Sequence, residues 1–400
     1  MMNNWNETLS ALVQPAPSDT ATATMALLAT AATAVTGTAG AMVAAGDGTA
    51  TPAASAANAA TATAASYADF GQALTALQLA DGFVAPVGNL GLIAVAGDDA
   101  ATFLHGQLTN DVTSLQSGAV RLAGYCTPKG RLQATMLMWR DAGAIYLQVP
   151  LSIQAGFQKR LSMFVMRAKA RLRDATGDPQ NAVVIGFGGA RADAALTAHV
   201  GPLPPAPDTS VNGAFGTVLR LADAFGAPRY LWLTSPVTAI GALPALRATL
   251  ALGGTDAWEL SGIHAGIPQV TPATIEQFVP QMINFELIGG VNFKKGCYPG
   301  QEIVARSQYL GKLKRRTTLV TIFGTAADTA AFAGAELFAS ADPDQPCGMV
   351  VNAAPNGAGG VDALVEVKLA ALEQEVHLGS TAGARVAFLT MPYTLDALDL

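Results

Sequence analysis

Residues 292–302 read NFKKGCYPGQE, and this segment contains one of only three cysteines in the chain. Cys297 follows two lysines and a glycine, whereas structural thiols usually lie among apolar neighbours. The lysines would favour a thiolate, and a turn at Pro299–Gly300 would hold the sulfur on an exposed loop. Gln301 and Glu302 add an amide and a carboxylate just after the turn. The segment predicts a functional cysteine; the alternative is a small turn residue beside solvated lysines.

The region around this cysteine is strongly basic for an acidic protein. Between residues 294 and 316 there are seven basic residues and a single acid, Glu302. So local a field suggests an anionic ligand or partner at a junction between domains. The basic residues are Lys294, Lys295, Arg306, Lys312, Lys314, Arg315 and Arg316.

Length and composition indicate a globular protein of two or three domains. The chain has 400 residues, of which 50% are hydrophobic and only 13% are charged, so a large core is available. Its net charge of −6 argues against a general nucleic-acid binder, although a local basic patch leaves nucleic acid as a less favoured partner. Residues 1–120 contain eight acids and no Lys or Arg.

The cysteines and histidines give no sign of a metal centre. Three cysteines cannot all pair with one another, and their wide spacing excludes a local ligand set of the CxxC type. The four histidines share no ligand spacing either, so we expect no metal site. Free thiols are typical of a reducing compartment, and we expect a cytoplasmic protein.

An Ala/Thr-rich extension precedes the expected folded region. Residues 1–66 are expected to be disordered, because Ala, Thr and Gly bury little apolar area. The uncharged run 20–46 is long enough to raise the alternative of a membrane segment. No basic residue flanks that run to orient its insertion, and we expect no direct association with a membrane.

Hydrophobic patterning divides the rest of the chain into an α+β part and a β-rich part. Short β runs separated by Gly, Pro and Asn follow residue 317 and predict a small antiparallel barrel. We expect domains at 67–200, 209–310 and 311–400, with a Pro-rich linker at 201–208. Within them we expect a helix from about residue 67, a strand at 90–97 and a helix from 98. Within 125–140 we expect a turn at Pro128–Gly130 that leads into a strand, with its hairpin partner at 144–150, and then a helix at 152–169.

The segment GFGGA, residues 186–190, follows an expected strand and invites comparison with a dinucleotide-binding loop. That fingerprint needs a third glycine, and Arg191 occupies its place. No helix with the required acid follows clearly. We therefore do not expect a dinucleotide site here.

Four segments together resemble one family. They are LHGQLTNDV (104–112), YCTPKGRL (125–132), IPQV…FVPQMINFELIGGVNFKKGCYPGQEIVAR (267–306) and YLGKLKRR (309–316). They are similar to the YgfZ family of folate-binding proteins, which is related in fold to the T-protein, the aminomethyltransferase of glycine cleavage. The resemblance covers roughly residues 80–395. Its most specific part is K-G-C-Y-x-G-Q-E, present here from Lys295 to Glu302.

The resemblance implies both a fold and a function. The fold class is α+β, with two T-protein-like α/β lobes and a C-terminal antiparallel β-barrel in a three-domain ring around tetrahydrofolate. The implied role is to assemble or maintain iron–sulfur clusters, including those of tRNA-modifying enzymes. Folate and iron–sulfur assembly proteins or client enzymes are the implied partners.

The resemblance also implies which residues form the site. Cys297 would be the reactive residue. Trp258 matches one folate-contacting tryptophan and Leu90 stands where the other would be, while Asn110 and Asp111 belong to a motif at the folate site. The remaining motif residues are Lys294, Lys295, Gly296, Tyr298, Gly300, Gln301, Glu302 and Arg306.

Two departures from the family pattern bear on activity. T-proteins carry an aspartate that serves the folate nitrogen, and Ala134 and Thr135 occupy the matching strand positions here. Without a carboxylate, aminomethyl transfer loses its charge-stabilising group, so we do not expect a working aminomethyltransferase. A folate-dependent one-carbon transferase is the alternative function, and a binding module that only senses folate is a third. His264 replaces a common glutamate before the Ala-Gly-Ile-Pro turn.

Overall fold

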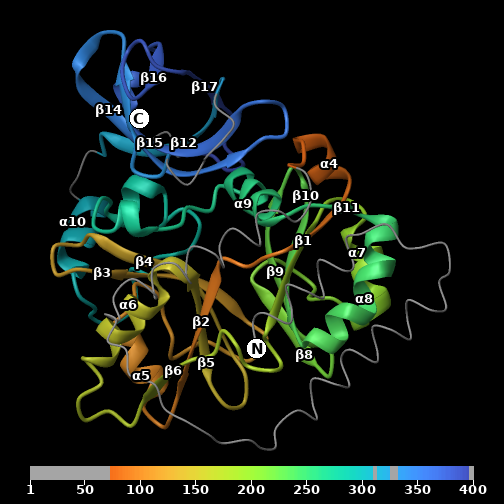
Figure 1. Cartoon of the computed structure of the whole chain (residues 1–400). Helices are drawn as coiled ribbons and strands as arrows, with labels where there is room; N and C mark the ends of the chain where they lie inside the picture. The colour runs from red at the N-terminus through yellow and green to blue at the C-terminus, as the bar shows by residue number, and fades with distance from the viewer. Residues whose placement is uncertain (1–72, 310–312, 325–331, 396–400) are drawn as a thin grey trace, which may run out of the picture. The chain divides into compact units, whose positions relative to one another are not determined.

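The structure, a computed structural model, describes residues 73–309, 313–324 and 332–395 (Figure 1). These residues all belong to one contact unit, Ala68–Leu400. The expected extension at 1–66 and the first residues of the helix expected from residue 67 lie outside the described residues. The helix itself, α4, spans Ala76–Asp81.

A five-stranded antiparallel sheet carries the first of the motifs. Its order is β3 (Val120–Cys126), β4 (Leu132–Arg140), β5 (Ile145–Pro150), β2 (Leu90–Ala96) and β6 (Arg171–Asp174). The expected strand pair is confirmed, because β4 and β5 are neighbours with Arg140 opposite Ile145. Alternate residues of β2 face opposite ways: Ile93 and Val95 pack with the helices α5 (Ala100–His105) and α6 (Leu151–Ser162), and Leu92 and Ala94 join the central core.

The helix expected at 152–169 is shorter than its spacing predicts. It ends at Ser162, with Lys159 and Arg160 in its last turn. Met166 then adopts φ 42°, which a right-handed helix does not allow. The chain continues as β6, where Leu172 pairs with Val95. Strand pairing at the edge of the sheet therefore outweighs the helical spacing of the sequence.

The strands of a six-stranded sheet come before and after those of the five-stranded sheet along the chain. Its order is β11 (Ala251–Leu252), β1 (Phe83–Pro86), β7 (Val183–Gly188), β10 (Ala227–Thr234), β9 (Gly216–Ala224) and β8 (Thr209–Gly213). All five strands of the first sheet lie between β1 and β7 along the chain. The expected range 67–200 therefore contributes strands to both sheets.

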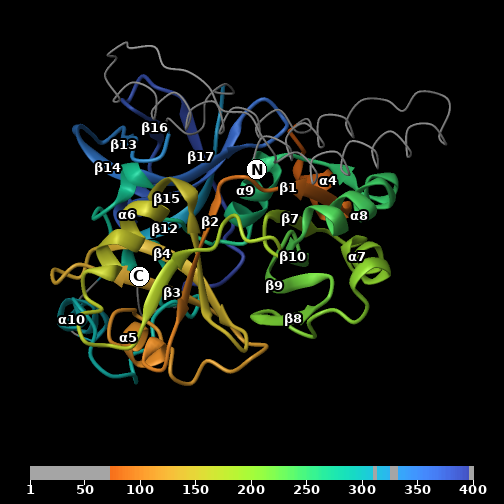
Figure 2. The ribbon, with the colours of Figure 1, turned by 60° about the horizontal axis from the view of Figure 1, so that its bottom comes forward.

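Helices cover both faces of the six-stranded sheet. On β10 the hydroxyl of Tyr230 donates to Asp193 of α7 (Ala192–Val200), which packs beside α8 (Pro236–Thr249) (Figure 2). Leu231 and Leu233 face the opposite side, where they join the cluster that contains residues of α9 (Thr255–His264). Alternation along one strand thus separates two layers of core.

The C-terminal part is the expected barrel. Six strands close in the order β12 (Arg315–Ile322), β15 (Val361–Lys368), β14 (Asp342–Pro355), β13 (Glu336–Ala339), β16 (Val376–Leu378) and β17 (Arg385–Leu389). The connection from the motif to the barrel includes α10 (Gln301–Tyr309). Short 3-10 turns occur at Pro272–Thr274, Pro280–Ile283 and Leu369–Ala371. The predicted class, two α/β lobes and a C-terminal β-barrel, is confirmed.

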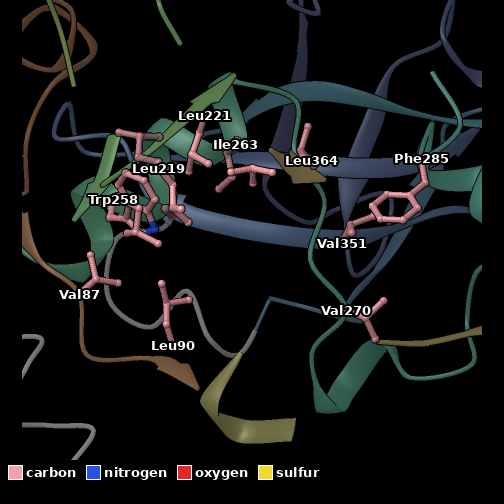
Figure 3. Close-up of a cluster of buried hydrophobic side chains, with 14 of the residues drawn as sticks. Val87, Leu90, Leu219, Leu221, Trp258, Ile263, Val270, Phe285, Val351 and Leu364 are labelled. Atoms are coloured by element: carbon pink, nitrogen blue, oxygen red, sulfur yellow. The ribbon is translucent and has the colours of Figure 1, made fainter. Parts of the chain in front are cut away.

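One apolar cluster joins both sheets and the barrel. It contains Leu90, Leu219, Trp258, Phe285 and Leu364, among others (Figure 3). α9 also contacts β14 and β15. No helix in the described part of the chain is both long and apolar enough to cross a membrane.

The last residue of α9 makes a polar link to the barrel. His264 Nε2 lies 2.7 Å from a carboxylate oxygen of Asp362, and the imidazole stacks on Phe225 with ring centroids 4.4 Å apart. Thr321 and Asn356 donate to the other oxygen of Asp362, at 2.7 and 3.0 Å. The residue that departs from the family pattern is thus part of a contact between α9 and β15.

Candidate functional site

The motif loop, residues 292–302, is held by a second turn packed against it. Gly300 adopts φ 81°, and a Cβ there would contact the carbonyl oxygen of Thr127 and lie 2.7 Å from the backbone of Gly130. Gly130 itself adopts φ 71°, and a Cβ there would lie 2.9 Å from the side chain of Ile303. Only glycine fits both positions. The TPKG and YPGQ turns, distant in sequence, therefore pack backbone to backbone.

This packing leaves the thiol on the surface. Cys297 is exposed, whereas Cys126 and Cys347 are buried. The following residue, Tyr298, is 7% exposed and anchors the loop. Helix α10 begins just beyond, where the backbone N–H of Gln301 donates to the Tyr298 carbonyl at 3.2 Å. The geometry therefore combines an accessible sulfur with a rigid backbone on either side of it.

Lys295 fixes the near side of the loop. Its ammonium donates to the carbonyls of His105, Leu108 and Gly296 at 2.6, 3.0 and 3.2 Å, and lies 4.8 Å from the centre of the Tyr298 ring. Burial lowers the pKa of Lys295 to about 8, although Asp111 and Cys297 act in the opposite direction. This lysine therefore serves the backbone of the loop, while Lys294 is exposed.

Titratable groups gather behind the loop. His105 Nδ1 lies 3.0 Å from a carboxylate oxygen of Asp111, and a Cβ on Gly296 would be 3.5 Å from Nε2 of the same imidazole. Burial alone would raise the pKa of Asp111, but hydrogen bonds from Ser114 and Thr113, together with His105, lower it well below its usual range. Asp111 is therefore ionised, and its carboxylate lies against the imidazole of His105.

Asn110 connects the same segment to the start of the loop. Its side-chain amide donates to the carbonyls of Leu122 and Gly289, at 2.8 and 2.7 Å, and its oxygen accepts from the backbone of Asp111 at 2.8 Å. Two of the residues expected at the folate site, Asn110 and Asp111, thus lie beside the motif loop. The LHGQLTNDV and KGCYPGQE motifs form one structural unit.

The other two expected folate residues lie in the central apolar cluster. Trp258 is 5% exposed, and Leu90 is 7% exposed (Figure 3). A Cβ on Gly186 would contact the indole of Trp258, and the guanidinium of Arg229 lies 4.5 Å from the centre of its ring. The GFGGA segment therefore provides close packing for a tryptophan.

Arg229 is the most deeply buried cation near that indole. Its Nε donates to Ser261 Oγ at 2.9 Å, and burial lowers its pKa to about 9. Leu90 also lines a small pocket between the two sheets, together with Leu231 and Leu233 of β10. Trp258 is not among the residues that line this pocket.

Glu259 is a residue of this region that our reading of the sequence missed. It follows Trp258 and accepts a hydrogen bond from Asn89, which precedes Leu90, so the two candidate folate residues are joined through their neighbours. Burial and the nearby Asp256 carboxylate together raise the pKa of Glu259 to about 7, and the bond from Asn89 opposes both. The signal in the sequence that could have identified Glu259 is its carboxyl group directly after Trp258, a predicted ligand contact.

The basic cluster at 294–316 is partly neutralised by acids from outside that window. Arg315 Nη1 lies 2.8 Å from Glu366, and Arg316 is buried and paired with Glu286. Lys312 lies outside the described residues. The predicted local field is therefore weaker than the sequence count suggests, because charges distant in the sequence meet in the fold.

Ala134 and Thr135, the strand positions that lack an aspartate, have structural roles. Ala134 is fully buried in the core beneath the helices of the first sheet, and Thr135 Oγ1 accepts from the backbone of Val270 at 3.0 Å. Among residues 73–309, 313–324 and 332–395, no group of three or more His, Cys, Asp or Glu side chains is placed to hold a metal.

Comparison with known proteins identifies the family. The tRNA-modifying protein YgfZ of Klebsiella pneumoniae (strain 342) is 33% identical over 235 residues, covering 59% of this chain and 69% of that protein. The chain belongs to the YgfZ family. The YgfZ protein of Escherichia coli O157:H7 is 31% identical over 230 residues, covering 58% of this chain and 69% of its own. No family model matches the chain.

A solved structure shares the fold. The YgfZ-family chain resembles the glycine cleavage system aminomethyltransferase T from Bartonella henselae with a TM-score of 0.65. The likeness covers 83% of this chain and 96% of that one at 16% sequence identity, so it establishes the architecture and not the activity. The predicted resemblance to the YgfZ family and to the T-protein fold is confirmed.

Proposed function

We propose that this chain binds tetrahydrofolate and supports the assembly or repair of iron–sulfur clusters, including those of tRNA-modifying enzymes. Family membership supports the link to tRNA modification, since the relatives are named tRNA-modifying proteins. The T-protein-like fold supports folate as the ligand. Cytoplasmic location is part of the same proposal, because free thiols suit a reducing compartment.

The observation that carries the proposal is the exposed thiol on a rigid loop. Two packed glycine turns, the Lys295 ammonium and the buried ring of Tyr298 all hold the backbone around Cys297. None of these contacts involves the sulfur of Cys297. The loop is therefore held in place while the thiol remains free to react. A nucleophile or sulfur carrier requires that arrangement.

A complementation experiment tests the role of the thiol. Cys297→Ala, expressed in cells that lack the native protein, should fail to restore methylthio-modified tRNA, the product of an iron–sulfur tRNA-modifying enzyme. Cys347→Ala is the matched control, because it removes a buried thiol from the barrel and leaves the loop intact. Full rescue by Cys297→Ala would reduce this cysteine to a turn residue.

A titration tests the ligand. Tetrahydrofolate should quench intrinsic tryptophan fluorescence, and Trp258→Ala should weaken binding roughly tenfold, equivalent to about 1.4 kcal/mol. Because Trp258 is buried, Trp258→Phe is measured beside it to separate loss of the ring system from loss of packing. Unchanged affinity in Trp258→Ala would place the folate elsewhere.

The alternative function is a folate-dependent one-carbon transfer, which the T-protein-like fold favours. The buried Ala134 and Thr135 weigh against it, since they leave no carboxylate to stabilise charge on the folate nitrogen. Incubation with tetrahydrofolate and a methylamine donor decides between the two. Appreciable formation of methylene-tetrahydrofolate would rank the transferase first.

A further inference from the structure

A second basic run lies outside the motif loop, at residues 159–173. Between residues 159 and 173 there are six basic residues and no acid. The run covers the last turn of α6, the loop that follows it and the edge strand β6 (Figure 1). We call residues 159–173 the basic edge. Its basic residues are Lys159, Arg160, Arg167, Lys169, Arg171 and Arg173.

Large apolar side chains are exposed on the basic edge. Met163, Phe164 and Met166 are 63%, 45% and 87% exposed. Met166 adopts φ 42°, a conformation rare for residues other than glycine, asparagine and aspartate. Three large apolar side chains are thus exposed within four positions, and exposed apolar patches mark interaction sites on protein surfaces.

Several cations around this patch are uncommitted. The side chains of Lys159, Arg167 and Arg171 form neither a hydrogen bond nor an ion pair with any residue that the structure describes. Arg173 is paired with Asp178 at 2.7 Å, and Lys169 makes an exposed contact with Asp98 at 3.6 Å. The basic edge thus differs from the run at 294–316, where Arg315 and Arg316 face carboxylates.

The backbone of the basic edge is also available on one side. β6 is the last strand of its sheet and pairs with β2 through Ile93–Ala96 opposite Arg171–Asp174. An edge strand keeps a row of amide and carbonyl groups directed away from the sheet. An extended peptide can add to such an edge through main-chain hydrogen bonds, while its side chains contact neighbouring residues.

We propose that the basic edge is a docking surface for an extended, acidic segment of a partner protein. The segment would pair with β6, place carboxylates near Arg167 and Arg171, and bury apolar side chains on Met163, Phe164 and Met166. Methionine suits such contacts, because its flexible thioether adapts to different partners. The proposal concerns recruitment of a protein and goes beyond folate binding and the thiol of Cys297.

Two other readings explain fewer of these features. Short, charged edge strands protect proteins from unwanted pairing, and that role accounts for the arginines but not for the exposed apolar patch. A single-stranded RNA would use the cations, yet it favours several aromatic side chains for stacking, and Phe164 is the one aromatic residue in the run. An acidic protein segment uses the charge, the patch and the free edge together.

The first experiment measures binding of a defined probe to the full chain. The probe is a fluorescein-labelled peptide of alternating Glu and Val, and its binding is measured by fluorescence anisotropy. We expect Arg167→Glu/Arg171→Glu to weaken binding at least tenfold and Phe164→Ser/Met166→Ser to weaken it about threefold or more. Arg385→Glu and Val237→Ser are the matched controls, since both residues are exposed and lie outside the basic edge.

The second measurement tests the mode of binding. Hydrogen exchange should slow at the β6 amides when the peptide binds, and a version of the peptide with proline in place of alternate valines should give neither binding nor protection. Binding unchanged in both basic-edge variants would overturn the proposal. So would tight binding of a polyuridine oligonucleotide or of phosphatidylserine vesicles in the absence of peptide binding. These outcomes do not depend on folate or on Cys297.

Discussion

Cys297 in the motif loop and Trp258 in the central apolar cluster are the two strongest site candidates, and they differ in how much they contribute to the packing of the protein. Cys297 is exposed, and the contacts that hold its loop involve its neighbours. Trp258 is 5% exposed and packs against Gly186 and Arg229. A change at the cysteine therefore tests chemistry, whereas a change at the tryptophan tests chemistry and stability together.

The largest expected effect is a loss of stability when the indole of Trp258 is removed from the central apolar cluster. Trp258→Ala should lower the free energy of unfolding by about 3–5 kcal/mol, because it removes a buried indole and leaves the Arg229 guanidinium without its ring contact. Trp258→Phe should lose less, since an aromatic ring remains. Urea denaturation checks both variants. A midpoint for Trp258→Ala equal to that of the parent would show that the indole has no structural duty.

The next effect tests how the motif loop is held. Gly300→Ala should cost roughly 3 kcal/mol, because it adds both a strained φ and a clash with Thr127 and Gly130. Gly289→Ala is the matched control: Gly289 has φ 78° with open space around its Cβ position, so only the strain, about 1 kcal/mol, should appear. Equal losses in the two variants would argue against tight packing of the turns.

A pH-dependent effect distinguishes the two regions further. The pKa of Glu259 is raised from 4.5 to about 7 in the folded protein, so the folded state holds this proton more tightly than the unfolded chain. Its ionisation therefore destabilises the fold as pH rises through that interval. Glu259→Gln should stabilise the protein by about 2 kcal/mol near pH 8 and change little near pH 5.

Denaturant melts at the two pH values give the comparison for Glu259→Gln. Glu302→Gln serves as control, because this glutamate is exposed in the first turn of α10 and should show no such difference. A Glu259→Gln variant that is equally stable relative to the parent at both pH values would contradict the raised pKa.

The smallest expected effect is at the cysteine itself. Cys297→Ala should change the free energy of unfolding by less than about 0.5 kcal/mol, as exposed positions without special contacts do. Thermal denaturation of the purified variant measures it. A loss of several kcal/mol would mean that the sulfur supports the loop, and the complementation result could then no longer be assigned to chemistry.

The sequence predicted the elements whose signals are local. The barrel followed from short alternating β runs, and the strand pair of β4 and β5 from two such runs separated by a turn. The helix at 152–169 was predicted too long, because apolar spacing does not reveal that Leu172 pairs with Val95 across the sheet edge. Local patterns cannot report a partner that is distant in the chain.

The same limit applies to the candidate site. Cys297 and its turn were recognisable from residue types alone, but the acids that neutralise Arg315 and Arg316 lie outside the basic window, at Glu366 and Glu286. Counting charge along the chain therefore overstated one basic run and gave no weight to the basic edge. Which cations remain free depends on tertiary contacts.

The interleaving of the two sheets has a consequence for biosynthesis. β1, at Phe83–Pro86, leaves the ribosome before any strand of the five-stranded sheet, yet its partners β7 and β11 end at Gly188 and Leu252. Because domains fold largely in the order of their synthesis, the five-stranded sheet can be complete while β1 still lacks both of its neighbouring strands. A nascent chain stalled when Asp174 has just emerged from the ribosome should therefore protect the five-stranded sheet from protease and leave β1 open to capture by a chaperone.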